Sequence, residues 1–404
     1  MEVSLPQDEQ FPNNKIKGCI IPWTHLFGAI NGEYKICCFS EYWSPVLGNH
    51  LDEIDDVWNG DAYKQVRRDF LQGKKIPACE KACYEKERLG SQSHRQNINE
   101  NYAHFQKLQE LTRPDGSIKN YPVYLDVRFG NTCNFRCRMC GPNDSTSWYK
   151  EKPSEGGKQF RKPIDKYTDN ETFWLNIDKI APNILEVYFA GGEPFVQDGH
   201  YKLLNYMIDN NHAKRISLSY NTNLSYQKYK NHDIRKLWRS FYNVKLWPSC
   251  DGYGSRVDYS RKGFSWNKFE ANIDYYKEYI QTISAVISIY SISTMPELLL
   301  WAKNRDLSVH GTTLIDPSHM SVTCLPIEAK KSINLKFKKF LKSNYHLFNR
   351  HELDMIKSWL SYMGAKDDSH LLKLFKSYNT KFDLTRNENF EATFPEYASW
   401  YKNI

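Results

Sequence analysis

Cys133-Asn134-Phe135-Arg136-Cys137-Arg138-Met139-Cys140 is the stretch that decides the fold and the chemistry of this chain. Its cysteines follow the pattern C-x3-C-x2-C at the end of a strand-like run, with no fourth cysteine nearby. Three thiolates are one short of the four that close a structural zinc site or ligate every iron of a cubane cluster. A [4Fe–4S] cluster held in this way keeps one iron free for an outside ligand, as a catalytic cluster requires. Spacing alone leaves open a zinc site completed by a distant His or Cys, or three core thiols.

The octet resembles the signature of the radical S-adenosylmethionine (radical SAM) superfamily. This resemblance implies that Cys133, Cys137 and Cys140 hold three irons of a catalytic [4Fe–4S] cluster, while SAM chelates the fourth. Where the family usually has an aromatic residue near the adenine, this chain has Met139, whose polarizable thioether can also pack on a purine. The resemblance further implies a flavodoxin or ferredoxin-type reductant and a 5′-deoxyadenosyl radical that abstracts hydrogen from the substrate.

Six strand-like runs, most of them separated by helix-compatible stretches, predict a parallel α/β architecture. With six units we expect an incomplete (β/α)6 barrel of the TIM type, which the resemblance also implies. Alternation along the strands places apolar side chains on one face and polar ones on the other. We expect the apolar faces to pack on covering helices and the polar faces to line an open interior, although the reverse orientation is the alternative. The runs are 123–129, 184–190, 216–221, 244–250, 283–291 and 307–314.

The second strand-like run leads into Gly191-Gly192-Glu193-Pro194. Paired glycines at a strand end allow positive φ and a close approach of a ligand to the backbone. A plain strand-to-helix turn would look the same in isolation. About 50 residues after the cysteine octet, it resembles the family's GGE motif. The resemblance implies that Gly191, Gly192 and Glu193 bind the amino group of SAM.

Two further segments match the family in part. Asn221 and Asn223 end the third run where the family has a polar Thr-Asn-Gly turn, although Leu224 stands in place of the glycine. Ser249 and Arg261 are spaced like the polar pair that holds the SAM carboxylate in peptide-modifying members. A guanidinium forks well onto a carboxylate, so Arg261 suits this role.

A second set of cysteines, with Gly32, Gly48-Asn49 and Trp58-Asn59 between its members, precedes the predicted barrel. It resembles the SPASM/twitch auxiliary-cluster domain, although it stands before the barrel and ends in C-x3-C instead of C-x2-C. The resemblance implies a second iron–sulfur cluster, with structural zinc as the alternative because four thiolates suit both. The spacing from Gly32 favours Cys37 over Cys38. The predicted ligands are Cys19, Cys37, Cys79 and Cys83.

The chain of 404 residues therefore has three predicted parts: an auxiliary-cluster domain over 1–115, a radical SAM barrel over 116–328 and a helical extension over 329–404. Ten cysteines and a polar start without a signal-peptide core predict reduced thiols in the cytoplasm. No apolar run reaches membrane-spanning length, and the net charge of +8 accompanies no recognised nucleic-acid module. We expect no membrane and no nucleic-acid partner.

The resemblance favours a peptide or protein substrate, because members with SPASM or twitch domains often modify peptides. A small molecule or nucleotide, as in the molybdopterin-precursor cyclase, is the second hypothesis. That cyclase's auxiliary cluster has three cysteines, so four N-terminal ligands count against it. A non-catalytic zinc protein that binds nucleic acid is the third.

Overall fold

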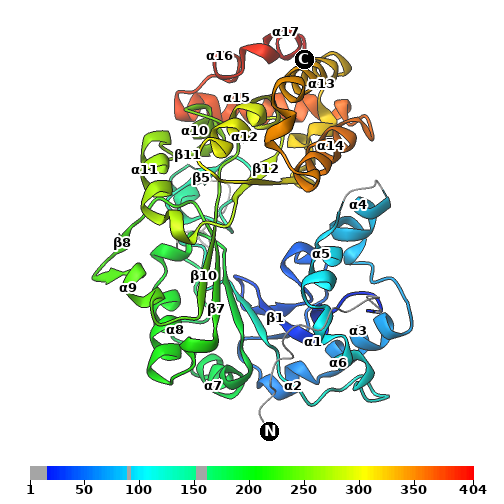
Figure 1. Ribbon diagram of the computed structural model, residues 1–404, viewed down its shortest axis with the longest axis vertical. Helices are drawn as coiled ribbons and strands as arrows, with labels where there is room; N and C mark the ends of the chain where they lie inside the picture. Colours follow the sequence, from blue (N-terminus) through cyan, green and yellow to red (C-terminus); the bar gives the residue numbers. More distant parts are fainter. Residues whose placement is uncertain (1–15, 89–91, 152–161) are drawn as a thin grey trace. The chain divides into compact units, whose positions relative to one another are not determined.

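The structure, a computed structural model, describes residues 16–88, 92–151 and 162–404 and divides the chain into two compact units (Figure 1). Unit 1 consists of the described residues of Met1–Asp126 and Asn170–Leu185. Unit 2 consists of the described residues of Val127–Asp169 and Glu186–Ile404. The polar start, on which the expected absence of a signal peptide rests, lies outside the described residues. The three predicted domain boundaries stay a prediction.

Parallel strands form the core of unit 2. Strand β7 pairs in parallel with β6 on one side and β10 on the other, and β12 pairs in parallel with β13. Two isolated parallel bridges lie beside β10 and β12, one between Leu246 and Ile280 and one between Ser249 and Ser284. These strands are β6 (Glu186–Phe189), β7 (Ser217–Thr222), β10 (Asn243–Pro248), β12 (Ile283–Ile287) and β13 (Val309–Thr313).

All six strand-like runs contain a strand. The first run holds β4 (Tyr124–Val127), which lies at the boundary of the two units, and the other five runs hold the five strands named above. The structure thus confirms a mixed α/β fold rich in parallel strands. Closure of the strands into a partial barrel stays a prediction.

Helices follow the strands of unit 2 and cover their apolar faces. Tyr220 of β7 shows this orientation, because its hydroxyl lies 3.0 Å from Nε2 of His200 and accepts a 3.2 Å hydrogen bond from Trp238. On the opposite face, the Ser219 hydroxyl contacts Glu186 of β6. For β7 the predicted orientation of the apolar face is therefore correct. The helices are α8 (Asp198–Asp209), α9 (Ile234–Trp238), α11 (Trp266–Tyr276) and α12 (Met295–Lys303).

The predicted C-terminal helices are present in unit 2, gathered near the C-terminus at the top of Figure 1. Helix α14 begins with a capping box in which Asn349 and Glu352 each accept a hydrogen bond from the other's backbone. Helix α15 ends at Asn387, which adopts a left-handed conformation with φ of 52°. These helices are α13 (Ile327–Asn344), α14 (Arg350–Gly364), α15 (Leu372–Arg386), α16 (Phe390–Thr393) and α17 (Ala398–Tyr401).

Unit 1 combines a small antiparallel sheet with short helices. The sheet contains β1 (His25–Gly28), β2 (Glu33–Lys35) and β3 (Gly48–Asn49), with β2 between the other two. Gly32 starts the β2 hairpin with φ of 88°, a conformation that favours glycine. The longer helices of this unit are α2 (Ile54–Trp58), α3 (Asp61–Leu71), α5 (His94–Asn101) and α7 (Glu171–Ile180), and its short helices are α1 (Ile21–Thr24), α4 (Glu85–Arg88) and α6 (Lys107–Glu110).

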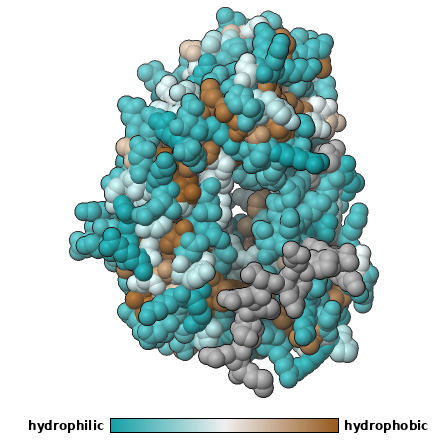
Figure 2. All heavy atoms as spheres, in the orientation of Figure 1, coloured by the Kyte–Doolittle hydropathy of each residue, from teal (hydrophilic) through white to brown (hydrophobic). Residues whose placement is uncertain are grey.

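The surface facing the reader in Figure 2 is mainly hydrophilic, with hydrophobic residues scattered between polar ones. Among the described residues, no helix combines the length and the apolar character that a membrane span needs.

Candidate functional site

The cysteine loop, residues 133–140, is fixed by hydrogen bonds from the segment that follows it. The Cys133 carbonyl accepts a 2.7 Å hydrogen bond from the Ser147 hydroxyl, and the Phe135 carbonyl accepts one of 2.6 Å from Ser145. Inside the loop, β5 (Arg136–Cys137) pairs antiparallel with β11 (Arg261–Lys262), so that Arg261 stands opposite Cys137. The backbone of the loop is thus held in place. Arg261, a predicted SAM ligand, lies next to Cys137, a predicted iron ligand.

The three thiols of the loop differ in exposure: Cys137 is buried, Cys133 is half-buried and Cys140 is exposed. Burial raises the pKa of Cys133 to about 12, and the neighbouring Cys137 adds to the shift. A hydrogen bond between Cys140 and Cys137 raises the pKa of Cys140 and lowers that of Cys137. A bound metal cluster would replace these protons, because metal ligation requires thiolates. Three adjacent thiols, one of them open to solvent, suit a cluster with an accessible iron.

The glycine turn lies directly against the start of the cysteine loop. Gly191 and Gly192 have φ of 77° and 49°, and a Cβ at Gly192 would lie 2.4 Å from the Thr132 carbonyl oxygen. The backbone N–H of Glu193 donates a 2.9 Å hydrogen bond to that same oxygen. Only glycine fits here, so the turn and the loop are packed backbone to backbone.

The Glu193 carboxylate is buried, with 1% of the residue exposed, and it accepts hydrogen bonds from the chain itself. Its partners are the Thr222 hydroxyl at 2.7 Å, the Asn223 N–H at 2.7 Å and the Phe195 N–H at 3.2 Å. Burial raises the pKa of Glu193 to about 7, and these hydrogen bonds oppose the rise. Glu193 therefore joins the glycine turn to the end of β7, while its predicted role toward SAM stays a prediction.

The end of β7 supplies two residues to the same place. Asn223 donates a 2.8 Å hydrogen bond from its amide to Asn134 of the cysteine loop. Asn221 stays half-buried in the strand, opposite Trp247 of β10. Thr222, which lies between the two predicted residues Asn221 and Asn223, was not among the predicted site residues. Thr222 is the last residue of β7, and its hydroxyl donates a hydrogen bond to Glu193.

Arg261 is held by a residue to which the sequence analysis gave no role in the site. Its guanidinium donates to both oxygens of Asp251, at 2.6 Å from Nε and 3.0 Å from Nη2. The Asp251 carboxylate also accepts a 2.8 Å hydrogen bond from the Val286 N–H. Asp251 and the neighbouring Cys137 raise the pKa of Arg261 against the effect of burial, so it stays a cation. Ser249 lies at the strand end, with its N–H bonded to Thr222.

The four predicted N-terminal ligands of unit 1 are all buried. Burial raises the pKa of Cys19, and the charges of the other three thiols add to the rise, so the four lie within electrostatic reach of one another. Burial likewise raises the pKa of Cys37 to about 11. Cys38 is only half-buried. This grouping suits the predicted ligand set, although Cys37 as the ligand stays a prediction. In the described part of the chain, no three His, Cys, Asp or Glu side chains are arranged as ligands of one metal ion.

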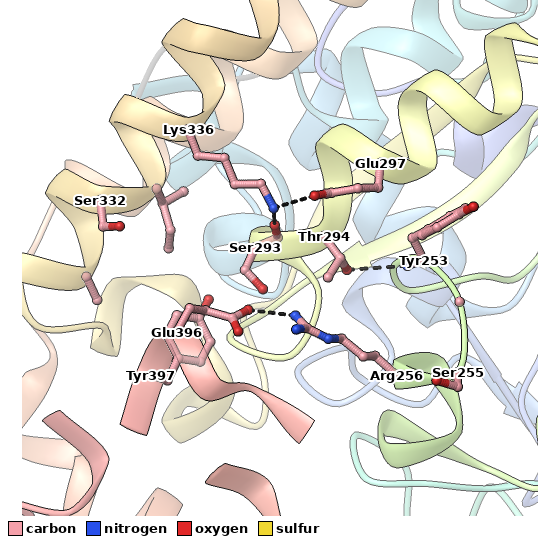
Figure 3. Close-up of a pocket in the computed structure, with 13 residues that line it drawn as sticks. Tyr253, Ser255, Arg256, Ser293, Thr294, Glu297, Ser332, Lys336, Glu396 and Tyr397 are labelled. Atoms are coloured by element: carbon pink, nitrogen blue, oxygen red, sulfur yellow. Dashed lines mark hydrogen bonds and ion pairs between the residues drawn. The ribbon is translucent and has the colours of Figure 1, made fainter. Parts of the chain in front are cut away.

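A pocket of about 450 Å³ opens where β10 and β12 of unit 2 lead into the following helices (Figure 3). Two ion pairs border it, Arg256 with Glu396 at 2.8 Å and Lys336 with Glu297 at 2.6 Å. Ligands of α/β folds bind at the carboxyl ends of the strands, which makes this a candidate substrate pocket. Its lining residues include Tyr253, Gly254, Ser255, Ser293, Thr294, Ser332 and Tyr397.

Residues 19–84 match the family model SPASM, described as an iron–sulfur cluster-binding domain. This match confirms the predicted resemblance of the N-terminal cysteine segment to the SPASM domain. The matched segment contains all four predicted auxiliary ligands.

Comparison with solved structures gives distant likenesses. The crystal structure of Streptococcus suis SuiB bound to S-adenosylmethionine is 15% identical, with a TM-score of 0.38, over 66% of this chain and 60% of that chain. SuiB bound to its precursor peptide SuiA is 16% identical, with a TM-score of 0.37, over 63% and 54%. This chain therefore spans less than two thirds of the length of those chains. No curated protein matched.

Proposed function

We propose that this protein is a radical SAM enzyme that modifies a peptide or protein substrate. One observation carries the proposal: the cysteine loop, the glycine turn, the end of β7 and Arg261 are far apart in sequence, yet they contact one another at one end of the strands of unit 2. The hydrogen bonds from Glu193 to Thr132 and from Asn223 to Asn134 make this convergence specific.

The residues present fit the implied cofactors. Cys133, Cys137 and Cys140 would hold three irons, and the Met139 thioether would pack on the adenine. When bound, the reduced cluster and SAM supply a 5′-deoxyadenosyl radical, which takes a hydrogen atom from a substrate C–H bond. Gly191 and Gly192 leave the backbone accessible for the SAM amino group, and the cationic Arg261 attracts its carboxylate. Asp251 orients that guanidinium by holding two of its nitrogens.

The finer architecture belongs to the same proposal. The six strands form a partial (β/α)6 barrel, and its polar faces line the space for SAM and substrate. In unit 1, Cys19, Cys37, Cys79 and Cys83 would ligate the auxiliary iron–sulfur cluster. The reductant is a flavodoxin or ferredoxin-type protein, and the compartment is the cytoplasm, which keeps thiols reduced.

A peptide substrate suits the pocket beyond β10 and β12. Both an arginine–glutamate and a lysine–glutamate pair border it, so charged and amide groups of a peptide find donors and acceptors there. A SPASM match in the same chain supports this substrate class.

The experiment is to measure iron, sulfide and 5′-deoxyadenosine formation after anaerobic reconstitution. Wild type is compared with a Cys133→Ala/Cys137→Ala/Cys140→Ala variant. We expect about eight irons in wild type and about four in the variant, with SAM cleavage lost. A colourless protein with stoichiometric zinc, or iron without SAM cleavage in wild type, would overturn the proposal.

A further inference from the structure

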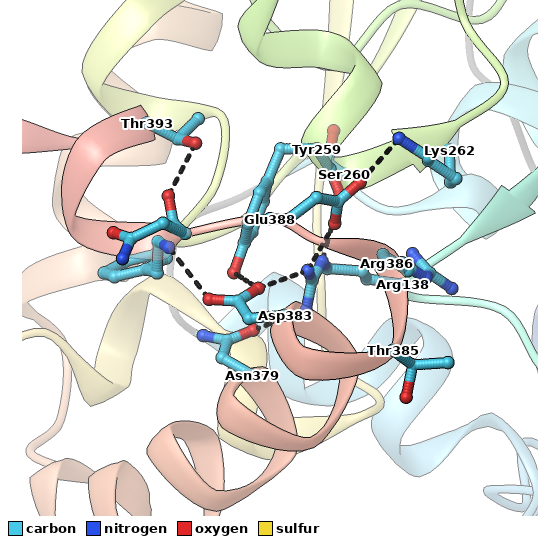
Figure 4. Close-up of polar contacts among 12 residues, drawn as sticks. Arg138, Tyr259, Ser260, Lys262, Asn379, Asp383, Thr385, Arg386, Glu388 and Thr393 are labelled. Carbon is cyan, nitrogen blue, oxygen red and sulfur yellow. Dashed lines mark hydrogen bonds and ion pairs between the residues drawn. The ribbon is translucent and has the colours of Figure 1, made fainter.

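Arg138, between the second and third cysteines of the loop, has none of its surface exposed. Its Nη2 donates hydrogen bonds to Asp383 at 2.6 Å and to Glu388 at 2.7 Å (Figure 4). Its Nη1 donates to the Asn379 side chain at 3.2 Å. These partners come from α15 and the turn after it, about 240 residues further along the chain. The guanidinium therefore fastens the cysteine loop to the C-terminal helices.

The backbone of Arg138 is held as firmly as its side chain. Its N–H donates a 2.7 Å hydrogen bond to the Ser260 carbonyl, and its own carbonyl accepts one of 2.7 Å from the Tyr378 hydroxyl. The guanidinium also lies 3.8 Å from the ring centre of Tyr259, in cation–π contact. With both peptide groups and the side chain engaged, the segment between Cys137 and Cys140 has little freedom to move.

The local sequence explains why Glu388 reaches Arg138. Asn387 takes up the left-handed conformation that ends α15, and the Glu388 N–H then bonds back to the Asp383 carbonyl at 2.9 Å. This reversal places both carboxylates on one guanidinium. An ordinary helix continuation would separate Asp383 and Glu388 along the helix surface.

Lys262 extends this cluster of charges. It forms a 2.9 Å ion pair with the second oxygen of Glu388 and a 3.1 Å ion pair with Asp258. Removing one member leaves an uncompensated charge in a buried place beside the cysteines. The reduction potential of an iron–sulfur cluster depends on net charge and hydrogen bonds around it. The cluster of Arg138, Lys262, Asp383 and Glu388 is therefore placed to affect both the shape and the electrostatics of the loop.

We propose that Asp383 and Glu388 are positioning residues that act through Arg138 to fix Cys137 and Cys140 in the geometry of the catalytic cluster. This inference rests on the proposed function. It assigns a role in the site to C-terminal helices whose sequence carries no sign of one.

The test compares Asp383→Asn, Glu388→Gln and Arg138→Met with wild type. In the apo-proteins, we expect faster amide hydrogen exchange over residues 133–140 in all three variants. In reconstituted protein, the potential of the loop cluster should rise in Glu388→Gln and fall in Arg138→Met, because the two changes have opposite charge. SAM cleavage should drop about tenfold or more, as for other residues that orient metal ligands.

Glu352→Gln is the matched control, because Glu352 on the C-terminal helix α14 forms an ion pair with Lys303 of α12 and not with the loop. It should lower thermal stability while leaving the potential and loop exchange at wild-type values. Equal exchange in all variants, or potential shifts of the same sign in Glu388→Gln and Arg138→Met, would overturn the inference. A wild-type protein without iron or SAM cleavage would instead overturn the proposed function, which the apo exchange measurement does not require.

Discussion

The two cysteine sets of this protein are built in opposite ways. The loop set lies within eight residues, and one of its thiols is exposed. The four N-terminal thiols are spread over residues 19–83, and all of them are buried. A compact, partly open set suits a cluster that must accept an outside ligand. A dispersed, buried set that bound a cluster would tie distant parts of a small unit together, so ligation there would support the structure of the unit as well as its chemistry.

The largest expected effect is on the open set. Cys140→Ser should abolish SAM cleavage, because an exposed thiol that completes the loop's ligand set has no substitute. Its effect on the free energy of unfolding of the apo-protein should stay within about 0.5 kcal/mol, as is usual for surface positions. Activity and denaturant unfolding measured on the same preparation check both parts. A strong loss of stability of the apo-protein would mean that Cys140 is a structural residue, and the two cysteine sets would then not differ in this respect.

For the buried N-terminal cysteines we expect a large effect on stability, in contrast to the loop cysteines. Cys79→Ala should remove about four irons and lower the thermal stability of unit 1 strongly, because cluster binding and folding are coupled there. Cys38→Ala is the matched control and should keep the iron content. If Cys38→Ala loses the auxiliary iron and Cys37→Ala does not, the ligand assignment moves to Cys38.

Backbone packing at the loop gives a third test. Gly192→Ala should destabilise the protein by about 1–3 kcal/mol and weaken SAM binding, because its Cβ would collide with the Thr132 carbonyl. Gly73→Ala in unit 1 is the control, since Gly73 also has positive φ but no atom within 4 Å of the added Cβ. Equal losses in the two variants would mean that φ alone, and not the contact with the loop, explains the effect. Denaturant unfolding and a SAM-binding titration provide the values.

The smallest effect concerns pH. Burial lowers the pKa of His200 in unit 2 to about 3, with a contribution from the charge of His232. The folded state therefore holds His200 neutral while the unfolded state takes up a proton below about pH 6.5, so its stabilising contribution is present above pH 6.5 and lost as pH falls toward 3. In His200→Gln, the free energy of unfolding should fall by about 1 kcal/mol less per pH unit than it does in wild type. The measurement is the free energy of unfolding at pH 7 and at pH 5. The same decrease between these two pH values in the variant and in wild type would contradict the account.

Local patterns explain what the sequence predicts well. The strand-like runs located β4, β6, β7, β10, β12 and β13, and the close spacing of Cys133, Cys137 and Cys140 led to the prediction that they share a cluster. Gly191 and Gly192 could be interpreted because a strand end needs a special backbone conformation there. Each of these features depends on neighbours within a few residues.

Contacts between distant residues explain what the sequence does not predict. Asp251 accepts a hydrogen bond from Arg261, ten positions away, and Thr222 of the next strand donates one to Glu193. Asp383 and Glu388 contact Arg138 over 245 and 250 positions. No periodicity encodes such pairings, because they depend on how the strands and the C-terminal helices pack together.

The most direct test of the central claim is electron paramagnetic resonance of the reduced protein with and without SAM. The Cys79→Ala variant simplifies the spectrum, since only the loop cluster should remain. We predict that SAM changes the spectrum of this reduced cluster, because one iron of a three-cysteine cluster is open to an outside ligand. An unchanged spectrum at saturating SAM would contradict the claim that residues 133–140 form an open catalytic site.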